Sequence, residues 1–182
     1  MLEFFKDTVS RIKVKNYPVH LKINTGLNRI GFSTQDVNRL INSINNDNFI
    51  KVDGIYSHLS SSEDKLEFDF TQKQISLFTK TFKKIIKNIS DKPLVHICNT
   101  SGVINFPDAH FDMVRCGIGI YGFSNKLTKI KSLIPVVSLK SSISQIHLIN
   151  EGESVGYNRS YIAETTKKIG TIPLGHADGI SR

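Results

Sequence analysis

Apolar residues recur every three or four positions in three segments of the chain, which is typical of amphipathic helices. The expected helices span residues 2–13, run from Ser33 or Thr34 to about Asn46, and span residues 67–89. Ser33 and Thr34 are residue types that cap helix N-termini. The apolar face of the third helix is formed by Phe70, Ile75, Phe78, Phe82, Ile85, Ile86 and Ile89.

Runs rich in β-branched residues lie between these helices and predict strands. Their ranges are 19–24, 50–60, 93–99 and 111–122, with one or two helical turns at 100–105. Strands that alternate with helices indicate a parallel sheet with helical crossovers. Polar and glycine residues gather at the carboxyl ends of these strands, where parallel α/β proteins bind ligands.

The pattern changes after about residue 128. Residues 134–149 form a long β-rich stretch, and no helical period follows it. We therefore expect an α/β domain over 1–128 and part of an antiparallel β domain over 129–182, with a boundary within 123–132. Four β/α units cannot close a (β/α)8 TIM barrel, which needs about 250 residues. The sequence is thus expected to be a segment cut at both ends.

Charge and cysteine content narrow the function classes. The net charge is +8, but the lysines are scattered along predicted helices, which favours a solvated surface over a nucleic-acid interface. No apolar run is long enough for a membrane span or a signal peptide. Cys98 and Cys116 each lie in an apolar stretch, which predicts two reduced, packed thiols of a cytoplasmic protein. No cysteine–histidine spacing suggests a metal site.

Several single residues are weak candidates for chemistry. Lys22 and Arg29 flank a glycine turn, and His58 follows a strand beside several hydroxyl residues. Tyr157 could accept a proton only if a nearby cation lowered its pKa from about 10. Each of these residues, taken alone, is more often structural than functional.

The ends of the next strands carry further candidates, although an Asn-Thr pair also caps helices without any ligand. His96, Asn99 and Thr100 end the strand at 93–99, and the free backbone amides at the start of the following helical turns would suit a phosphate. Arg115 is followed by Gly117, which lets the backbone approach a ligand closely. Neither a dinucleotide-binding fingerprint nor a Walker A motif occurs.

Four motifs in this order and spacing resemble the alanine racemases: HLKINTGLNRIGF, CNTSG, MVRCGIGIYG and GYNRSY. The resemblance covers nearly the whole chain. It implies the last four β/α units of a partial (β/α)8 TIM barrel, followed by the start of the C-terminal β domain. It also implies a cytoplasmic homodimer that uses pyridoxal 5'-phosphate (PLP) to interconvert L- and D-alanine for peptidoglycan.

The resemblance assigns three residues to the substrate side of the cofactor. Lys22 matches a lysine that is carbamylated in many family members and then orients a neighbouring arginine. Arg29 matches that arginine, which approaches the cofactor's phenolic oxygen and the substrate carboxylate. His58 matches the histidine that lies against the cofactor ring.

The resemblance assigns four further residues to cofactor binding around the phosphate. Asn99 and Thr100 match an Asn-Ser pair in which the hydroxyl binds the phosphate, and threonine keeps that hydroxyl. Gly117 and Ile118 match backbone donors to the same group.

The remaining roles concern the cofactor ring and the partner subunit. Arg115 matches the arginine that bonds the pyridine nitrogen; because arginine can only donate, it should leave that nitrogen unprotonated. Tyr157 matches the catalytic tyrosine that reaches the partner's active site. His96 and His176 are expected to lie behind the residues that touch the cofactor, and His176 stands where the family usually has tyrosine.

The resemblance also sets a limit on activity. The lysine that holds PLP belongs to the first barrel strand, which the sequence does not contain, so we expect this chain alone to be inactive. A non-catalytic PLP-binding fragment is an alternative. A single-domain PLP-homeostasis barrel lacks a counterpart of residues 134–179, and basic amino-acid decarboxylases fit GYNRSY and IPLGHADG poorly.

Overall fold

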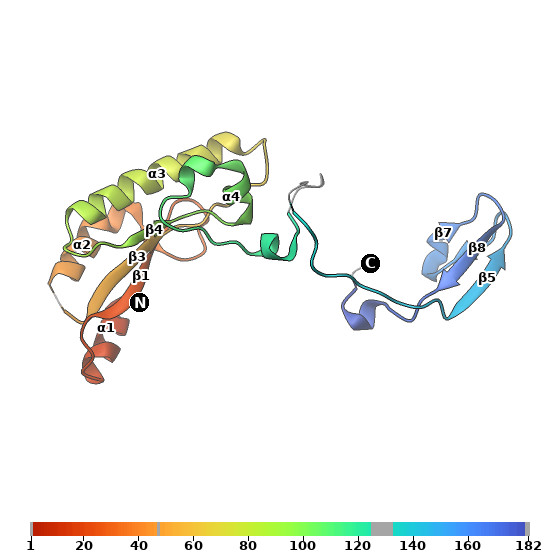
Figure 1. The fold of residues 1–182 in the computed structure, drawn as a ribbon, viewed down its shortest axis with the longest axis horizontal. Helices are drawn as coiled ribbons and strands as arrows, with labels where there is room; N and C mark the ends of the chain where they lie inside the picture. The colour runs from red at the N-terminus through yellow and green to blue at the C-terminus, as the bar shows by residue number, and fades with distance from the viewer. Residues whose placement is uncertain (1, 47, 125–132, 181–182) are drawn as a thin grey trace. The chain divides into compact units, whose positions relative to one another are not determined.

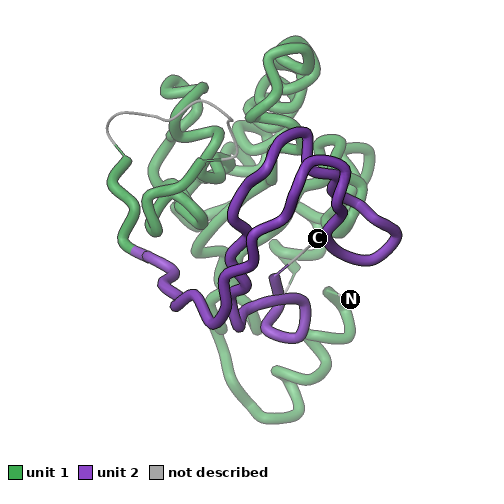
Figure 2. Tube along the Cα trace, turned by 90° about the vertical axis from the view of Figure 1, so that its right-hand side faces the viewer, with its two compact units in different colours: residues 1–136 green, residues 137–182 purple. Residues whose placement is uncertain are grey.

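Helices and parallel strands alternate through the first part of the chain, and short antiparallel strand pairs follow (Figure 1). The computed structural model describes residues 2–46, 48–124 and 133–180. It divides into two units, Met1–Val136 and Val137–Arg182, which are coloured separately in Figure 2. The predicted boundary between residues 128 and 129 lies outside the described residues.

The first unit contains a four-stranded parallel sheet in the order β2-β1-β3-β4. Its strands are β1 (Tyr17–Asn24), β2 (Phe32–Ser33), β3 (Ile50–Tyr56) and β4 (Leu94–His96). Its helices are α1 (Leu2–Arg11), α2 (Val37–Asn45), α3 (Phe68–Lys87) and α4 (Thr100–Asn105). The parallel α/β architecture predicted for this part of the chain is confirmed.

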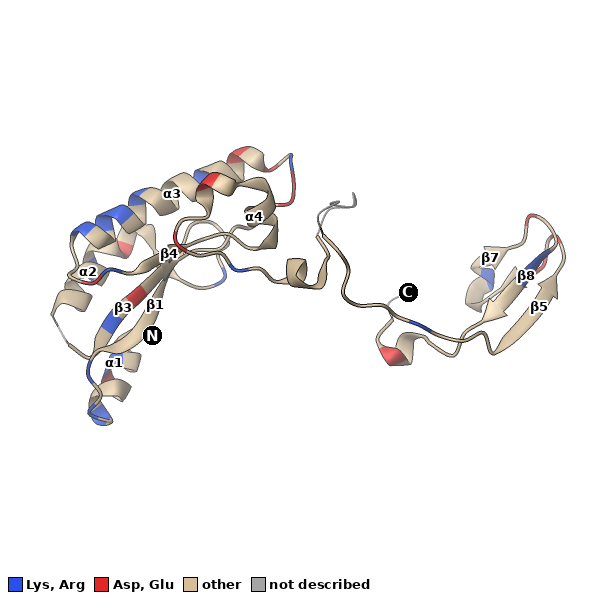
Figure 3. Ribbon diagram, in the orientation of Figure 1, with Lys and Arg blue, Asp and Glu red and all other residues tan. Residues whose placement is uncertain are grey.

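Helices α2 and α3 pack on one face of this sheet and form the hydrophobic core with it (Figure 1). Leu21 and Ile23 of β1 are buried against Phe78 of α3 and its neighbours in that core. The lysines of α3 remain exposed on the side of the helix away from the core, as expected for a solvated surface (Figure 3).

A register shift determines which residues share the opposite face of the sheet. Val19 pairs with Val52, but His20 pairs with Gly54, so Asp53 is an extra residue in β3. The shift keeps Ile55 in the core, and it brings Gly54 and Tyr56 onto the same face as His20 and Lys22. This surface is called the site face below.

The strand predicted over residues 111–122 does not form. Residues 111–117 run beside β4, where the amides of Asp112 and Arg115 donate to the carbonyls of Val95 and Cys98, each over 3.0 Å. The amide of Val95, however, donates to the Asp112 carboxylate over 2.8 Å instead of to a backbone carbonyl. A side chain thus occupies the position that a strand ladder needs, and a 3-10 turn follows at Ile118–Tyr121.

The second unit is built from two antiparallel pairs, β5 with β8 and β6 with β7. The strands are β5 (Gln145–Ile149), β6 (Ser154–Val155), β7 (Tyr161–Ile162) and β8 (Lys167–Thr171). The β-rich stretch predicted at 134–149 forms a strand only over its last five residues. Among the described residues of this unit, only Ala163 is buried.

Two general features of the described residues bear on function. None of their helices combines the length and apolar content needed to cross a bilayer. Within the same residues, no group of histidine, cysteine and carboxylate side chains could hold a metal ion.

Candidate functional site

Polar side chains from four consecutive segments meet at the carboxyl edge of the parallel sheet. Lys22, Tyr56 and His96 are register partners on β1, β3 and β4, so they form one row across the site face. His58 follows β3, and Arg115 lies on the extended segment beside β4. The topology therefore brings these residues together although up to 93 positions separate them in the sequence.

Arg115 is the centre of this cluster, and its guanidinium is anchored by two backbone carbonyls. One terminal nitrogen donates to Ser57 O over 2.8 Å and to Ile97 O over 3.3 Å. The same nitrogen lies 3.2 Å from His58 Nδ1, and the other terminal nitrogen bonds His96 Nδ1. Because a guanidinium can only donate, both histidines must accept through Nδ1 and are neutral, with the proton on Nε2.

The pKa values of the cluster follow from this arrangement. Burial, and next the charge of Arg115, lower the pKa of His96 to about 4. The same two causes lower the pKa of His58. Burial, Arg29 and Arg115 together lower the pKa of Lys22.

The positive charge of Arg115 is not balanced by a carboxylate of the described residues. Among the described residues, no Asp or Glu lies within ion-pair distance of Arg115. Burial lowers the pKa of Arg115, but a guanidinium keeps its charge in proteins. A cation without a carboxylate partner favours an anionic ligand.

Tyr56 provides an aromatic surface between the cations. Its ring stacks on His96 with 5.0 Å between centroids and 8° between planes. The Arg115 guanidinium carbon lies 5.3 Å from the Tyr56 centroid, and Lys22 Nζ lies 5.8 Å from it. Tyr56 therefore positions both cations through cation–π contacts. Each such contact contributes about 0.5–1 kcal/mol when it is exposed to water.

Thr100 and the glycines after Arg115 form a cluster of backbone donors. The Thr100 hydroxyl oxygen accepts from the amides of Gly117, over 2.9 Å, and Gly119, over 3.3 Å. A Cβ at Gly119 would lie 2.8 Å from the Thr100 methyl carbon, so the close approach requires glycine. Asn99 caps α4, since its side-chain oxygen accepts from Gly102 N over 2.9 Å, and it also accepts from the Ser62 hydroxyl.

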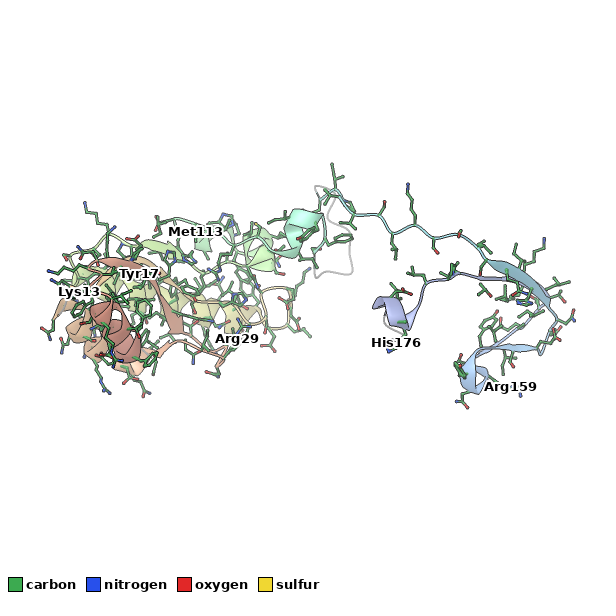
Figure 4. The ribbon with its side chains drawn as sticks, turned by 90° about the horizontal axis from the view of Figure 1, so that it is seen from below. Lys13, Tyr17, Arg29, Met113, Arg159 and His176 are labelled. Atoms are coloured by element: carbon green, nitrogen blue, oxygen red, sulfur yellow. The ribbon has the colours of Figure 1, made fainter. Side chains whose placement is uncertain are left out.

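Most of the predicted site residues lie at this edge of the first unit: Lys22, His58, His96, Asn99, Thr100, Arg115, Gly117 and Ile118. Arg29 lies in the exposed loop between β1 and β2, where Figure 4 labels it. Tyr157 and His176 belong to the second unit, and both are exposed, Tyr157 by 88%. Their roles stay predictions.

Cys116 differs from its prediction as a packed thiol, because it is exposed on the segment that leaves the sheet edge. Cys98 is buried as expected, and its thiol donates to Ala109 O over 3.2 Å. Burial raises the pKa of Cys98 to about 11, so this thiol is inert.

Three residues of the site were not found from the sequence: His20, Tyr56 and Gln74. His20 and Tyr56 alternate with buried neighbours along their strands, a signal that places them on the site face once the register is known. Gln74 is buried on α3, where its side-chain oxygen accepts from Ser60 N over 3.0 Å and its nitrogen donates to His58 O over 3.4 Å. It thereby holds the loop that carries His58.

The fold and this site define a parallel α/β protein with a cationic ligand site at the carboxyl edge of its sheet, joined to an antiparallel β unit. Residues 5–125 match the sequence model described as alanine racemase, N-terminal domain, and residues 136–182 match alanine racemase, C-terminal domain. The alanine racemase of Treponema denticola is 38% identical over 168 residues, which are 90% of this chain and 44% of that protein. The chain belongs to the alanine racemase family.

Solved structures agree with this assignment. The alanine racemase of Streptomyces lavendulae matches with a TM-score of 0.86 and 25% identity, over 100% of this chain and 49% of that one. The alanine racemase of Bartonella henselae, solved with covalently bound pyridoxal phosphate, matches with a TM-score of 0.74 and 26% identity, over 97% of this chain and 47% of that one. The chain thus spans about half the length of the relatives it matches.

Proposed function

We propose that this chain is part of a PLP-dependent alanine racemase, an isomerase that interconverts L- and D-alanine and supplies D-alanine for peptidoglycan. The proposal places the protein in the cytoplasm, because its cysteines are free thiols. It also treats the first unit as the second half of a (β/α)8 barrel and the second unit as the start of the C-terminal β domain. In support, Lys22, Tyr56 and His96 of the site face lie at the carboxyl edge of the parallel sheet, where (β/α)8 barrels bind their ligands.

The observation that carries the proposal is the state of Arg115. Its guanidinium is fixed by two carbonyls and two neutral imidazoles, and no carboxylate of the described residues neutralises it. Most PLP enzymes place a carboxylate at the pyridine nitrogen, which keeps that nitrogen protonated. Arg115 would instead donate to the nitrogen and leave it without a proton.

The cluster at Thr100 fits a phosphate group. The amides of Gly117 and Gly119 converge on one hydroxyl oxygen, which is an acceptor as phosphate oxygens are. A Cβ built at Gly117 would meet only Thr100 Oγ1, at 3.9 Å, so the backbone there is open to a ligand. We assign phosphate binding to Thr100 and to the amides of Gly117 and Ile118, with Asn99 holding the helical turn.

PLP, when bound, supplies an electron sink for the pair left at the alanine Cα when its proton is removed. In this proposal His58 lies against the cofactor ring, and Arg29 binds the alanine carboxylate. The lowered pKa of Lys22 increases the fraction of neutral amine, which is the form that carbon dioxide converts to a carbamate. We therefore propose that Lys22 is carbamylated in the assembled site and orients Arg29.

Tyr157 is proposed to move the proton at the opposite face of Cα in the partner subunit of a homodimer. Its side chain is 88% exposed in this chain, as expected if it completes a site on another subunit. His176 is proposed to lie behind the residues that contact the cofactor, as is His96.

A chimera tests the proposed function. The segment of the Treponema denticola enzyme that matches this chain would be replaced by residues 1–182, and alanine racemisation would be assayed. We expect turnover, and we expect Arg115→Glu to reduce it at least about 100-fold because a transition-state donor is lost. Arg39→Glu, an exposed arginine on α2, is the matched control and should keep the activity. Equal activity of both variants would contradict the proposal.

The isolated chain supplies a second test. With added PLP it should racemise alanine no faster than free PLP does, because the resemblance places the PLP lysine outside this sequence. Turnover clearly above that background would show that the chain contains a sufficient site of its own.

A further inference from the structure

The imidazole of His20 reaches across a whole strand to contact His96. His20 lies on β1 and His96 on β4, with β3 between them, yet His20 Nδ1 and His96 Nε2 are 3.0 Å apart. The ring centroids are separated by 5.1 Å. The resemblance gave His20 no role, and no other polar contact of its side chain is found among the described residues.

Gly54 makes this contact possible. The register shift in β3 places Gly54 directly opposite His20. A Cβ at that position would lie 2.4 Å from His20 Nδ1, 2.5 Å from Cε1 and 2.6 Å from Cγ. The His20 ring therefore lies over the Gly54 backbone, and any larger residue would displace it.

The direction of the hydrogen bond follows from Arg115. The guanidinium donates to His96 Nδ1, so the remaining His96 proton is on Nε2. That proton points to His20 Nδ1, which must accept it. The three side chains form one directed series, in which Arg115 donates to His96 and His96 donates to His20.

We propose that His20 is a positioning residue that holds the His96 imidazole with Nδ1 toward Arg115 and thereby fixes the guanidinium in the site. The stacking of His96 on Tyr56 sets the plane of the ring, but it would tolerate a flip about the Cβ–Cγ bond, which puts Cδ2 in place of Nδ1 and Cε1 in place of Nε2. A bond at each nitrogen does not tolerate that flip. The importance of a fixed Arg115 rests on the proposed function, whereas the hydrogen-bond series does not.

Nuclear magnetic resonance of the 182-residue chain, labelled with ¹⁵N, tests the series directly. We expect a scalar coupling across the hydrogen bond between His96 Nε2 and His20 Nδ1, and the Nε2–H tautomer of His96. Absence of the coupling together with an Nδ1–H tautomer of His96 would overturn the proposal.

Variants test the effect on Arg115. Exchange of the Arg115 guanidinium protons with water should be about three- to tenfold faster in His20→Leu and Gly54→Ala, where one hydrogen bond that orders the series is lost. His20→Asn places an oxygen where Nδ1 was and should restore slow exchange. His147→Leu, an exposed histidine on β5, is the control and should leave the exchange unchanged.

The outcomes separate the two proposals. Exchange in Gly54→Ala and His20→Leu equal to that of the unmodified chain would overturn the role of His20. If His20→Leu does not fold, the comparison of His20→Asn with Gly54→Ala still tests the role of His20. His20→Asn keeps an acceptor for His96, whereas Gly54→Ala displaces the His20 ring and its acceptor. Failure of the chimera to racemise alanine would count against the proposed function and would leave these spectra unchanged.

Discussion

Arg115 organises the site at the scale of single residues, because one side chain fixes two histidine tautomers and satisfies two carbonyls. Ser57 O and Ile97 O accept from it at the point where β3 and β4 end. A strand end leaves backbone carbonyls without a ladder partner, and a buried acceptor without a donor is costly. The arginine therefore stabilises the carboxyl edge of the sheet in addition to its proposed role toward a ligand.

We expect Arg115→Gln to lower the free energy of unfolding by about 1–3 kcal/mol, since buried acceptors lose their donor. Urea unfolding, monitored through the hydrogen exchange of the β1 and β3 amides, would measure this change in the free energy of unfolding. The matched control is Arg11→Gln, whose exposed ion pair with Asp7 should contribute no more than about 1 kcal/mol. A loss no larger for Arg115→Gln than for Arg11→Gln would show that the anchoring is unimportant.

His96 makes the stability of the first unit depend on pH. Its pKa is about 4 in the folded chain, against 6.5 for the free side chain. Above pH 6.5 His96 is neutral in both the folded and the unfolded chain, so it does not reduce the free energy of unfolding. Between pH 6.5 and about pH 4 His96 binds a proton only in the unfolded chain, and the free energy of unfolding therefore falls as the pH falls. The loss should reach at most about 3 kcal/mol, and less where water at the site face screens the charge.

Urea titrations from pH 7 to pH 4 would show this loss, and His96→Gln should flatten it. His147→Gln, an exposed histidine of the second unit, should leave the profile as it was. Part of the slope should remain in His96→Gln because the pKa of His58 is lowered by the same surroundings. An unchanged profile in His96→Gln would assign the pH dependence to other groups.

The positions of His58, Asn99 and Thr100 at the carboxyl edge of the sheet were predictable, because each lies at the end of a predicted strand. Arg115 was placed on a predicted strand that does not form, and it reaches the same edge from an extended segment. His20 and Tyr56 could not be found in the same way, because their position depends on the register shift at Asp53. One extra residue in a strand exchanges the two faces, and nothing in the local pattern of β3 marks where it lies.

At the scale of elements, α3 shows what helical periodicity can and cannot predict. The expected bounds of 67–89 agree closely with Phe68–Lys87, but the expected apolar face is partly wrong. Phe70 is 38% exposed, whereas Thr71 and Gln74 are buried. Gln74 is tolerated there because its amide bonds the loop around His58, and such backbone partners are invisible in a hydrophobic pattern.

Phe78 is the residue through which α3 should stabilise the sheet most. It is fully buried, and its ring contacts those of Phe82, at 5.3 Å, and Phe111, at 5.9 Å, between centroids. Phe78→Ala should therefore cost about 3–5 kcal/mol, combining lost burial with a cavity. Leu77→Ala, one residue earlier and 39% exposed, should cost much less in the same urea titration. Equal losses would place the centre of the core elsewhere.

At the scale of the whole molecule, the described residues leave polar and apolar side chains exposed at positions that folded proteins ordinarily cover. His20 lies in the middle of β1 and is nevertheless exposed, although parallel sheets are ordinarily covered on both faces. In the second unit, apolar side chains such as Ile146 and Leu148 are more than 60% exposed. Both observations fit the proposal that another half-barrel and a partner subunit complete the structure.

Mixed dimers of the chimera would show which subunit Tyr157 serves. One chimera would carry Tyr157→Phe and the other would lack the PLP lysine contributed by the Treponema denticola segment; each alone should be inactive. If Tyr157 reaches the partner's site, a mixed dimer contains one site with both groups intact and one with neither. Random pairing makes half of all dimers mixed, so co-expression should restore about a quarter of the activity of the unmodified chimera.

If Tyr157 instead serves its own subunit, every site in the mixed dimer lacks one base and no activity returns. The absence of complementation would therefore contradict a site shared between subunits.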